Sequence, residues 1–165
     1  MSRPDPKEPR PAPVFDQELE AMVSDIELLE ACEARMDRGE LLNVSRQDRY
    51  RLAEAVLTST YLYFLIAPDS MLIKIAKGRD VKKSLRTVQT QSPVEIRLMG
   101  AVRVHQDIQD RLQSLFAATR SHGDWFHATE DLLDVIQAGT EQGFRTMMLR
   151  MQSLKHKRLT TRINR

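Results

Sequence analysis

The chain has 165 residues, with 25 lysines and arginines against 23 aspartates and glutamates, and a formal net charge of +2 at pH 7. This length suits one domain with a single substantial core. The single cysteine excludes an internal disulfide, and because the N-terminus also has no apolar signal region, we expect a cytoplasmic protein.

The small net charge conceals two ends of opposite sign. The segment 16–37 contains eight acidic residues and one base, Arg35, whereas the segment 145–165 contains seven bases and no acid. The acidic end suits basic partners or the chain's own basic tail, and the basic end suits phosphate or an acidic protein surface.

Residues 1–14 are polar and rich in proline, and we expect them to form a disordered arm because they offer little apolar surface to bury. The folded part should be a single helical domain over 15–159, followed by a basic tail over 160–165. A first helix is predicted from Phe15 to Arg38, ending at Gly39. Its apolar residues follow a heptad spacing typical of a bundle or a dimer interface. The residues of this seam that we assign to self-association or partner contact are Phe15, Leu19, Met22, Ile26 and Leu29.

A second helix should begin at Ser45, with Asp48 three residues later as in a capping box, and end at Pro68. Its second half, 61–67, is apolar on every face, which predicts the most buried helix of the domain. The run is too short and too interrupted to cross a membrane, so we expect no membrane contact.

Short helices are predicted over 69–77 and from Asp80 to about Val88, followed by a polar loop up to Ser92. The segment 75–85 has a short helix, a glycine and a basic following helix, as in a helix-turn-helix, but its glycine comes too early for the usual turn register.

Ser92 and Pro93 are typical of a helix start, which predicts a helix from there to about Arg120. The alternation of Val94, Ile96 and Leu98 leaves a strand open at this point. A turn over 121–124 and two further helices should complete the domain. The first of these spans about 124–138, with Gly139 as its end. The second carries four apolar residues on one face and frays after Leu159; these residues are Phe144, Met147, Met151 and Leu154.

Helix-forming residues are plentiful, aromatic residues make up only 5%, and β-branched residues are sparse. These features together predict an all-α fold, an irregular bundle of five or six helices with the second helix at its centre.

The sequence contains no glycine-rich phosphate loop, nucleophile elbow or paired-cysteine zinc motif. His122, Asp124 and His127 lie close in sequence but match no metal-binding spacing. His105 on a helix could resemble a phosphoacceptor, yet a hydrogen-bonded histidine at the core edge is the simpler interpretation. We therefore expect no enzyme, no metal site, no cofactor and no small-molecule substrate.

Phosphate attraction requires clustered bases with few acids nearby, and two clusters meet that condition. The first consists of Lys74, Lys77, Arg79, Lys82, Lys83 and Arg86. The second consists of Arg150, Lys155, Lys157, Arg158, Arg162 and Arg165. The alternative is that the first is a solvated face and the second a solubilising extension that complements its helix dipole.

The leading hypothesis is a small, non-enzymatic accessory or regulatory protein that holds nucleic-acid phosphates through these clusters, as an oligomer or within an assembly. The competing hypothesis is a protein-interaction module, such as a scaffold, adaptor or chaperone, whose basic tail docks on an acidic partner. Met147, Met148 and Met151 of the last helix are plausible docking elements because methionine suits adaptable helical grooves, but ordinary core packing is the simpler interpretation.

Overall fold

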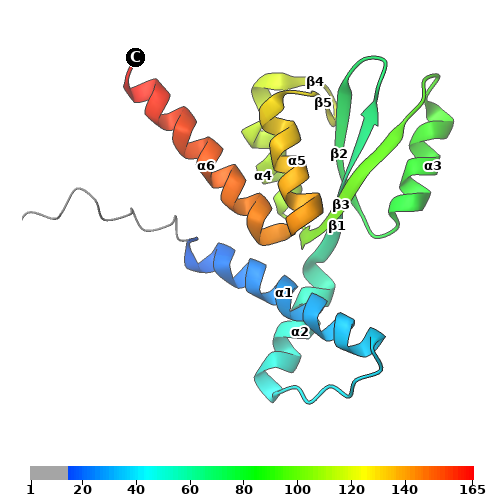
Figure 1. Ribbon diagram of the computed structural model, residues 1–165, viewed down its shortest axis with the longest axis vertical. Coiled ribbons are helices and arrows are strands. Elements are labelled where there is room, and N and C mark those ends of the chain that lie inside the picture. The colour runs from blue at the N-terminus through cyan, green and yellow to red at the C-terminus, as the bar shows by residue number, and fades with distance from the viewer. Residues whose placement is uncertain (1–14) are drawn as a thin grey trace, which may run out of the picture.

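The computed structural model describes residues 15–165, which form a mixed α/β domain with a five-stranded antiparallel sheet (Figure 1). The helices are α1 (Gln17–Asp37), α2 (Arg46–Thr58), α3 (Val81–Gln91), α4 (Ile108–Leu115), α5 (Glu130–Gln142) and α6 (Phe144–Ile163), with one 3₁₀ turn, η1 (Ala117–Thr119). The strands are β1 (Ser59–Ala67), β2 (Leu72–Gly78), β3 (Arg97–His105), β4 (Arg120–His122) and β5 (Trp125–His127). The prediction of an all-α bundle is therefore wrong, and the predicted N-terminal arm lies outside the described residues.

The sheet is built around β1. Its strand order is β3-β1-β2-β5-β4, so β1 pairs antiparallel with β3 on one side and β2 on the other. Side chains from both faces of β1 are buried: Leu62 and Phe64 point to one side of the sheet, Tyr63 and Leu65 to the other. The predicted second helix is confirmed only as far as Thr58, because the apolar run that follows it is this central strand.

The β1–β2 connection replaces the predicted short helix over 69–77. Pro68 ends the apolar run as expected, but the chain turns back at once, with Met71 at a φ of 53°, and enters β2. Ile73 and Ile75 are fully buried on one face, while Lys74 lies on the other. This alternation has the period of a strand.

The first half of the predicted helix over 92–120 is also wrong. Residues 97–105 form β3, in agreement with the alternative of a strand in this region. Within the predicted helix, α4 is the α-helical part. Downstream, β5 occupies the start of the helix predicted over 124–138. The helix α5 therefore begins only at Glu130, where the Thr129 side chain caps it. Gly139 lies inside α5, and Gly143, with a φ of 96°, separates α5 from α6.

The remaining helix predictions are closer. The helix predicted over 15–38 is confirmed as α1, and the helix predicted from Asp80 is α3, although α3 continues to Gln91 through the expected loop. The last helix continues to Ile163 rather than fraying after Leu159. None of the helices within residues 15–165 combines the length and apolar character that crossing a membrane requires.

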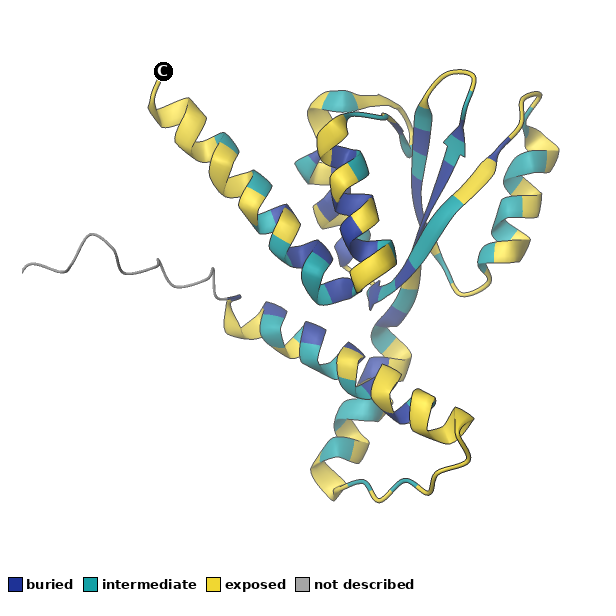
Figure 2. Ribbon diagram, viewed as in Figure 1, coloured by how far each residue is buried: buried dark blue, intermediate teal, exposed yellow. Residues whose placement is uncertain are grey.

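The two faces of the sheet are covered unequally (Figures 1 and 2). Side chains of α1, α4, α5 and α6 pack with the strands into the main core on one face. On the other face α3 is the helix that packs over the sheet, against a smaller cluster centred on Tyr63, Leu65 and Ile96. The domain therefore has a thick side and a thin side, and α3 lies on the thin one.

Strand β3 and helix α5 approach each other at Gly100. A methyl group added there would lie 2.6 Å from Thr140 Cγ2, closer than van der Waals contact allows. We predict that Gly100→Ala lowers the free energy of unfolding by about 1–3 kcal/mol, the usual cost of overpacking a core. Thr140→Ala removes the closest atom and should restore part of that loss in the double variant. Urea unfolding of the four proteins of this cycle tests the contact, and strictly additive effects would contradict it.

Candidate nucleic-acid interface

The α3 residues of the first basic cluster and the second basic cluster lie on opposite sides of the sheet. The first cluster lies on β2, α3 and the residues between them, whereas the second lies on α6, which packs on the thick side (Figure 1). The clusters therefore do not combine into one site. The sequence could not indicate this, because their relative position depends on the sheet.

The first cluster is itself divided. Lys74 is half-buried, its ammonium lies 5.6 Å from the centre of the Trp125 ring, and its Nζ lies 3.8 Å from Asp124 Oδ2. Lys77 Nζ donates a hydrogen bond of 3.0 Å to the carbonyl oxygen of Gln106. These two lysines of β2 therefore have partners within the chain.

Arg79 precedes α3 and also has a partner in the chain, because its guanidinium donates a hydrogen bond of 3.5 Å to the carbonyl oxygen of Val56. The remaining members of the first cluster are on the outer side of α3, and we call them the α3 basic face. The α3 basic face consists of Lys82, Lys83 and Arg86.

The α3 basic face exists because α3 is two-sided. Its inner side places Val81, Leu85 and Val88 against the smaller core cluster, which leaves all three bases exposed. Asp80 caps the helix by accepting a hydrogen bond of 3.0 Å from the backbone nitrogen of Lys83. Across the described part of the chain, no carboxylate forms an ion pair with these three bases.

A polar network holds the part of β2 that extends past the end of β5. Gln113, which is buried, donates hydrogen bonds of 3.0 Å to the carbonyl oxygen of Ile75 and to Asp124 Oδ1. Gln109 donates a further bond to the same carbonyl, and Arg120 donates to Gln113 Oε1. These bonds satisfy a strand carbonyl that has no strand partner, and they fix the turn that carries Asp124.

The second cluster is partly neutralised by acids of α5. Arg150 forms an ion pair with Asp134 at 3.1 Å, and Arg158 lies 3.9 Å from Asp131 while also donating to the carbonyl oxygen of Leu115. The other four bases are exposed, three along the distal half of α6 and one just beyond its end (Figure 2). They are Lys155, Lys157, Arg162 and Arg165.

The predicted partner seam of the first helix lies against the chain's own core. Phe15, Leu19, Ile26 and Leu29 are buried, and Met22 is half-buried against the same cluster. Packing within the chain therefore accounts for the heptad spacing of α1.

The acidic side of α1 has an internal partner as well. Arg145, at the start of α6, donates bidentate hydrogen bonds of 2.9 Å to Glu20 and bonds of 3.0 and 2.5 Å to Glu27. The Arg145 hydrogen bonds hold the pKa of Glu20 below its usual range. The oppositely charged ends of the sequence thus meet at the base of α6.

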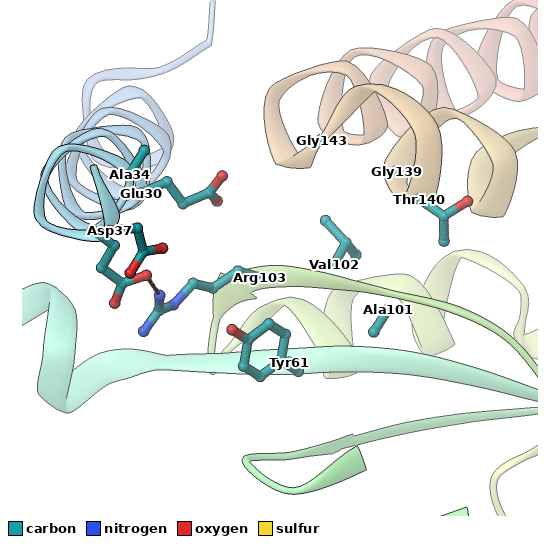
Figure 3. Close-up of a pocket in the computed structure, with 11 residues that line it drawn as sticks. Glu30, Ala34, Asp37, Tyr61, Ala101, Val102, Arg103, Gly139, Thr140 and Gly143 are labelled. Atoms are coloured by element: carbon teal, nitrogen blue, oxygen red, sulfur yellow. Dashed lines mark hydrogen bonds and ion pairs between the residues drawn. The ribbon is translucent and has the colours of Figure 1, made fainter. Parts of the chain in front are cut away.

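A pocket of about 380 Å³ opens between α1, β3 and α5 (Figure 3). Arg103 of β3 reaches across it to pair with Glu33, and its guanidinium lies 5.6 Å from the centre of the Tyr61 ring. Sequence reasoning did not identify this ion pair. It missed Arg103 because that residue is 70 positions away from Glu33, and no local signal connects them.

The titratable side chains that line this pocket are mostly acidic. Burial raises the pKa of Glu30, Arg103 opposes that shift, and the neighbouring Glu33 and Glu27 carboxylates add to it. The lining contains no serine, cysteine or histidine, and the Thr140 hydroxyl already donates to the carbonyl oxygen of Ile136. The pocket thus combines a carboxyl group of raised pKa with further carboxylates, from Glu33 and Asp37, and with Tyr61.

The histidines considered in the sequence analysis do not line this pocket. His105 ends β3 rather than lying on a helix, and its Nδ1 accepts a hydrogen bond of 3.2 Å from the Asp107 backbone. His122 Nδ1 lies 2.9 Å from Ser121 Oγ. Over residues 15–165, no group of three histidine, cysteine, aspartate or glutamate side chains is arranged to hold a metal.

Comparisons with protein-family models, curated proteins and solved structures find no match to this chain.

The raised pKa of Glu30 predicts a specific pH dependence. A carboxyl group whose pKa is higher in the folded state opposes folding once it ionises, so this cost is present at neutral pH and disappears as the pH falls below the unfolded value of about 4.3. Glu30→Gln should therefore raise the urea midpoint slightly at pH 7 and lose that advantage at pH 4. If Glu30→Gln is instead less stabilising at pH 7 than at pH 4, the pKa of Glu30 is shifted in the opposite direction and the prediction is wrong.

Proposed function

We propose that this protein is a non-enzymatic accessory or regulatory protein that binds nucleic acid by its phosphate backbone, and that the α3 basic face is the contact surface. The observation that carries the proposal is the arrangement of Lys82, Lys83 and Arg86. Three exposed bases gather on one side of a short helix, and no acid in the described part of the chain pairs with them.

The α3 basic face has an energetic cost that a polyanion would remove. Lys82 and Arg86 are one helical turn apart, and like charges at this spacing destabilise a helix by about 0.2–0.5 kcal/mol. A phosphate backbone would turn this repulsion into attraction and release counterions from the nucleic acid.

The rigid setting of the bases also supports the proposal. The inner side of α3 packs on the sheet through Leu85 and Val88, so the helix presents its outer side in a fixed orientation. Backbone contact of this kind positions a nucleic acid without selecting its sequence. We accordingly expect binding with little base preference.

The test is a salt series of fluorescence anisotropy with labelled duplex DNA and single-stranded RNA. Changing Lys82, Lys83 and Arg86 together to glutamine should weaken binding at least tenfold and reduce the salt slope by about two to three, because each phosphate contact contributes about one. The matched control removes the same charge from α6, with Lys157, Arg162 and Arg165 changed to glutamine, and should leave affinity within threefold.

Two results would overturn the proposal. The unmodified protein could fail to bind either nucleic acid at low salt. Alternatively, the α6 control could lose as much affinity as the α3 variant, which would mean that overall charge or the tail, rather than the α3 basic face, determines binding.

A further inference from the structure

A groove of about 620 Å³ runs between the start of α1, α4 and α6, on the side of the sheet opposite α3. Its floor is apolar and is contributed by all three helices. The floor consists of Leu19, Met148 and Met151, which are buried, of Leu115, which is half-buried, and of Leu159, which is exposed. Methionine side chains adapt their shape easily, so a floor of this composition can accommodate varied apolar partners.

The rim of the groove is basic. Lys155, Arg158 and Arg162 line it from one side of α6, at the i, i+3, i+7 spacing of a single helix face. Arg111 of α4 adds a fourth base, against the two rim acids Asp16 and Asp110. The apolar floor is therefore bordered by an excess of positive charge.

The distal end of α6 leaves apolar surface uncovered. Leu159, which lines the groove, is 50% exposed, and Ile163, one turn further, is 82% exposed. This part of the helix extends away from the sheet (Figures 1 and 2). Helices without tertiary contacts are marginally stable in water, so an additional partner would stabilise it.

The groove also contains an unsatisfied polar atom. Gln152 Oε1 is buried without a hydrogen-bond partner, and Gln152 is among the lining residues. A buried acceptor in this condition carries a desolvation cost within the protein.

We propose that this groove binds an amphipathic helix of another protein, with its apolar side on the methionine and leucine floor and acidic side chains facing the basic rim. Residues 148–162 of α6 span about 21 Å at 1.5 Å per residue, which matches about four turns of a partner helix. An apolar stripe docked into such a groove is a recurrent mode of peptide recognition.

Charge complementarity favours this occupant over residues 1–14 and over the α6 helix of a second copy. The α6 helix of a second copy is itself basic, and residues 1–14 contain three bases and two acids. Neither segment complements the rim. Nucleic acid is also a poor match, because phosphate would leave the apolar floor without a partner. The proposal does not depend on nucleic-acid binding by the α3 basic face.

The probe is a pair of fluorescein-labelled 18-residue peptides with one leucine and methionine stripe, carrying glutamate or lysine at the same polar positions. The full-length protein should bind the acidic peptide saturably, and the basic peptide at least tenfold more weakly. Lys155→Glu and Leu159→Asp should each weaken the acidic peptide at least fivefold. Lys157→Glu is the matched control, because Lys157 is exposed on the same helix without lining the groove, and it should change affinity less than twofold.

Circular dichroism of each variant verifies that it is folded, and both substituted groove residues are already exposed at the surface. The variant lacking the three α3 bases should bind the acidic peptide normally, which separates this site from the α3 basic face. Saturating oligonucleotide should not displace the peptide.

Several outcomes would overturn the proposal. Equal binding of the two peptides, equal losses in the Lys155 and Lys157 variants, or no saturable binding would each remove the role of charge complementarity at the rim. Displacement by a synthetic peptide of residues 1–14 would identify the chain's own segment as the occupant. A dimer in light scattering that Leu159→Asp dissociates would identify a second copy.

Discussion

The burial of β1 on both faces is the constraint on which the rest of the structure depends. Leu62, Phe64 and Leu65 have no solvent exposure, and Tyr63 has almost none. A strand of this kind needs a hydrogen-bonded neighbour on each edge, which β2 and β3 supply, and a cover on each face. The cover is thick on one face, where four helices pack, and thin on the other, where α3 packs. Both proposed binding surfaces follow from this asymmetry, since α3 turns its outer side to solvent and α6 extends past the edge of the thick layer.

Charge separation along the sequence serves first to hold the fold together. Arg145 binds Glu20 and Glu27, which raises the pKa of the Arg145 guanidinium even above its usual value and joins the acidic helix α1 to the start of α6. Arg145 is the first basic residue of α6. Further along, the acids of α5 lie near Arg150 and Arg158, and beyond them the helix has fewer partners. The charge available for binding therefore increases towards the C-terminal end of α6.

The sequence predicted most of the helices, and it failed at the strands, which it largely assigned to helices. The run 61–67 follows directly from a helix and is apolar at every position, so periodicity could not distinguish a buried strand from a buried helix. The basic residues of the α3 face were identified, because exposed charge is visible in the sequence. The sequence did not predict that these residues are separated from the α6 cluster. It also did not predict the Arg103–Glu33 pair or the groove, because each depends on elements that only the tertiary fold brings together.

The two surfaces differ in chemistry as well as in position, and this difference determines what each can bind. The α3 basic face has charge on the outside and no apolar floor, so a ligand that is mostly charge, such as a phosphate backbone, satisfies it completely. The groove between α1, α4 and α6 has a different balance, because its rim charges border an apolar floor on which Leu159 is still half exposed to solvent. The sheet between them separates the two sites, and ligands at sites without shared contacts bind with nearly additive free energies. A protein built in this way could hold a nucleic acid on its thin side and an acidic helix on its thick side simultaneously, which is the physical requirement for an adaptor.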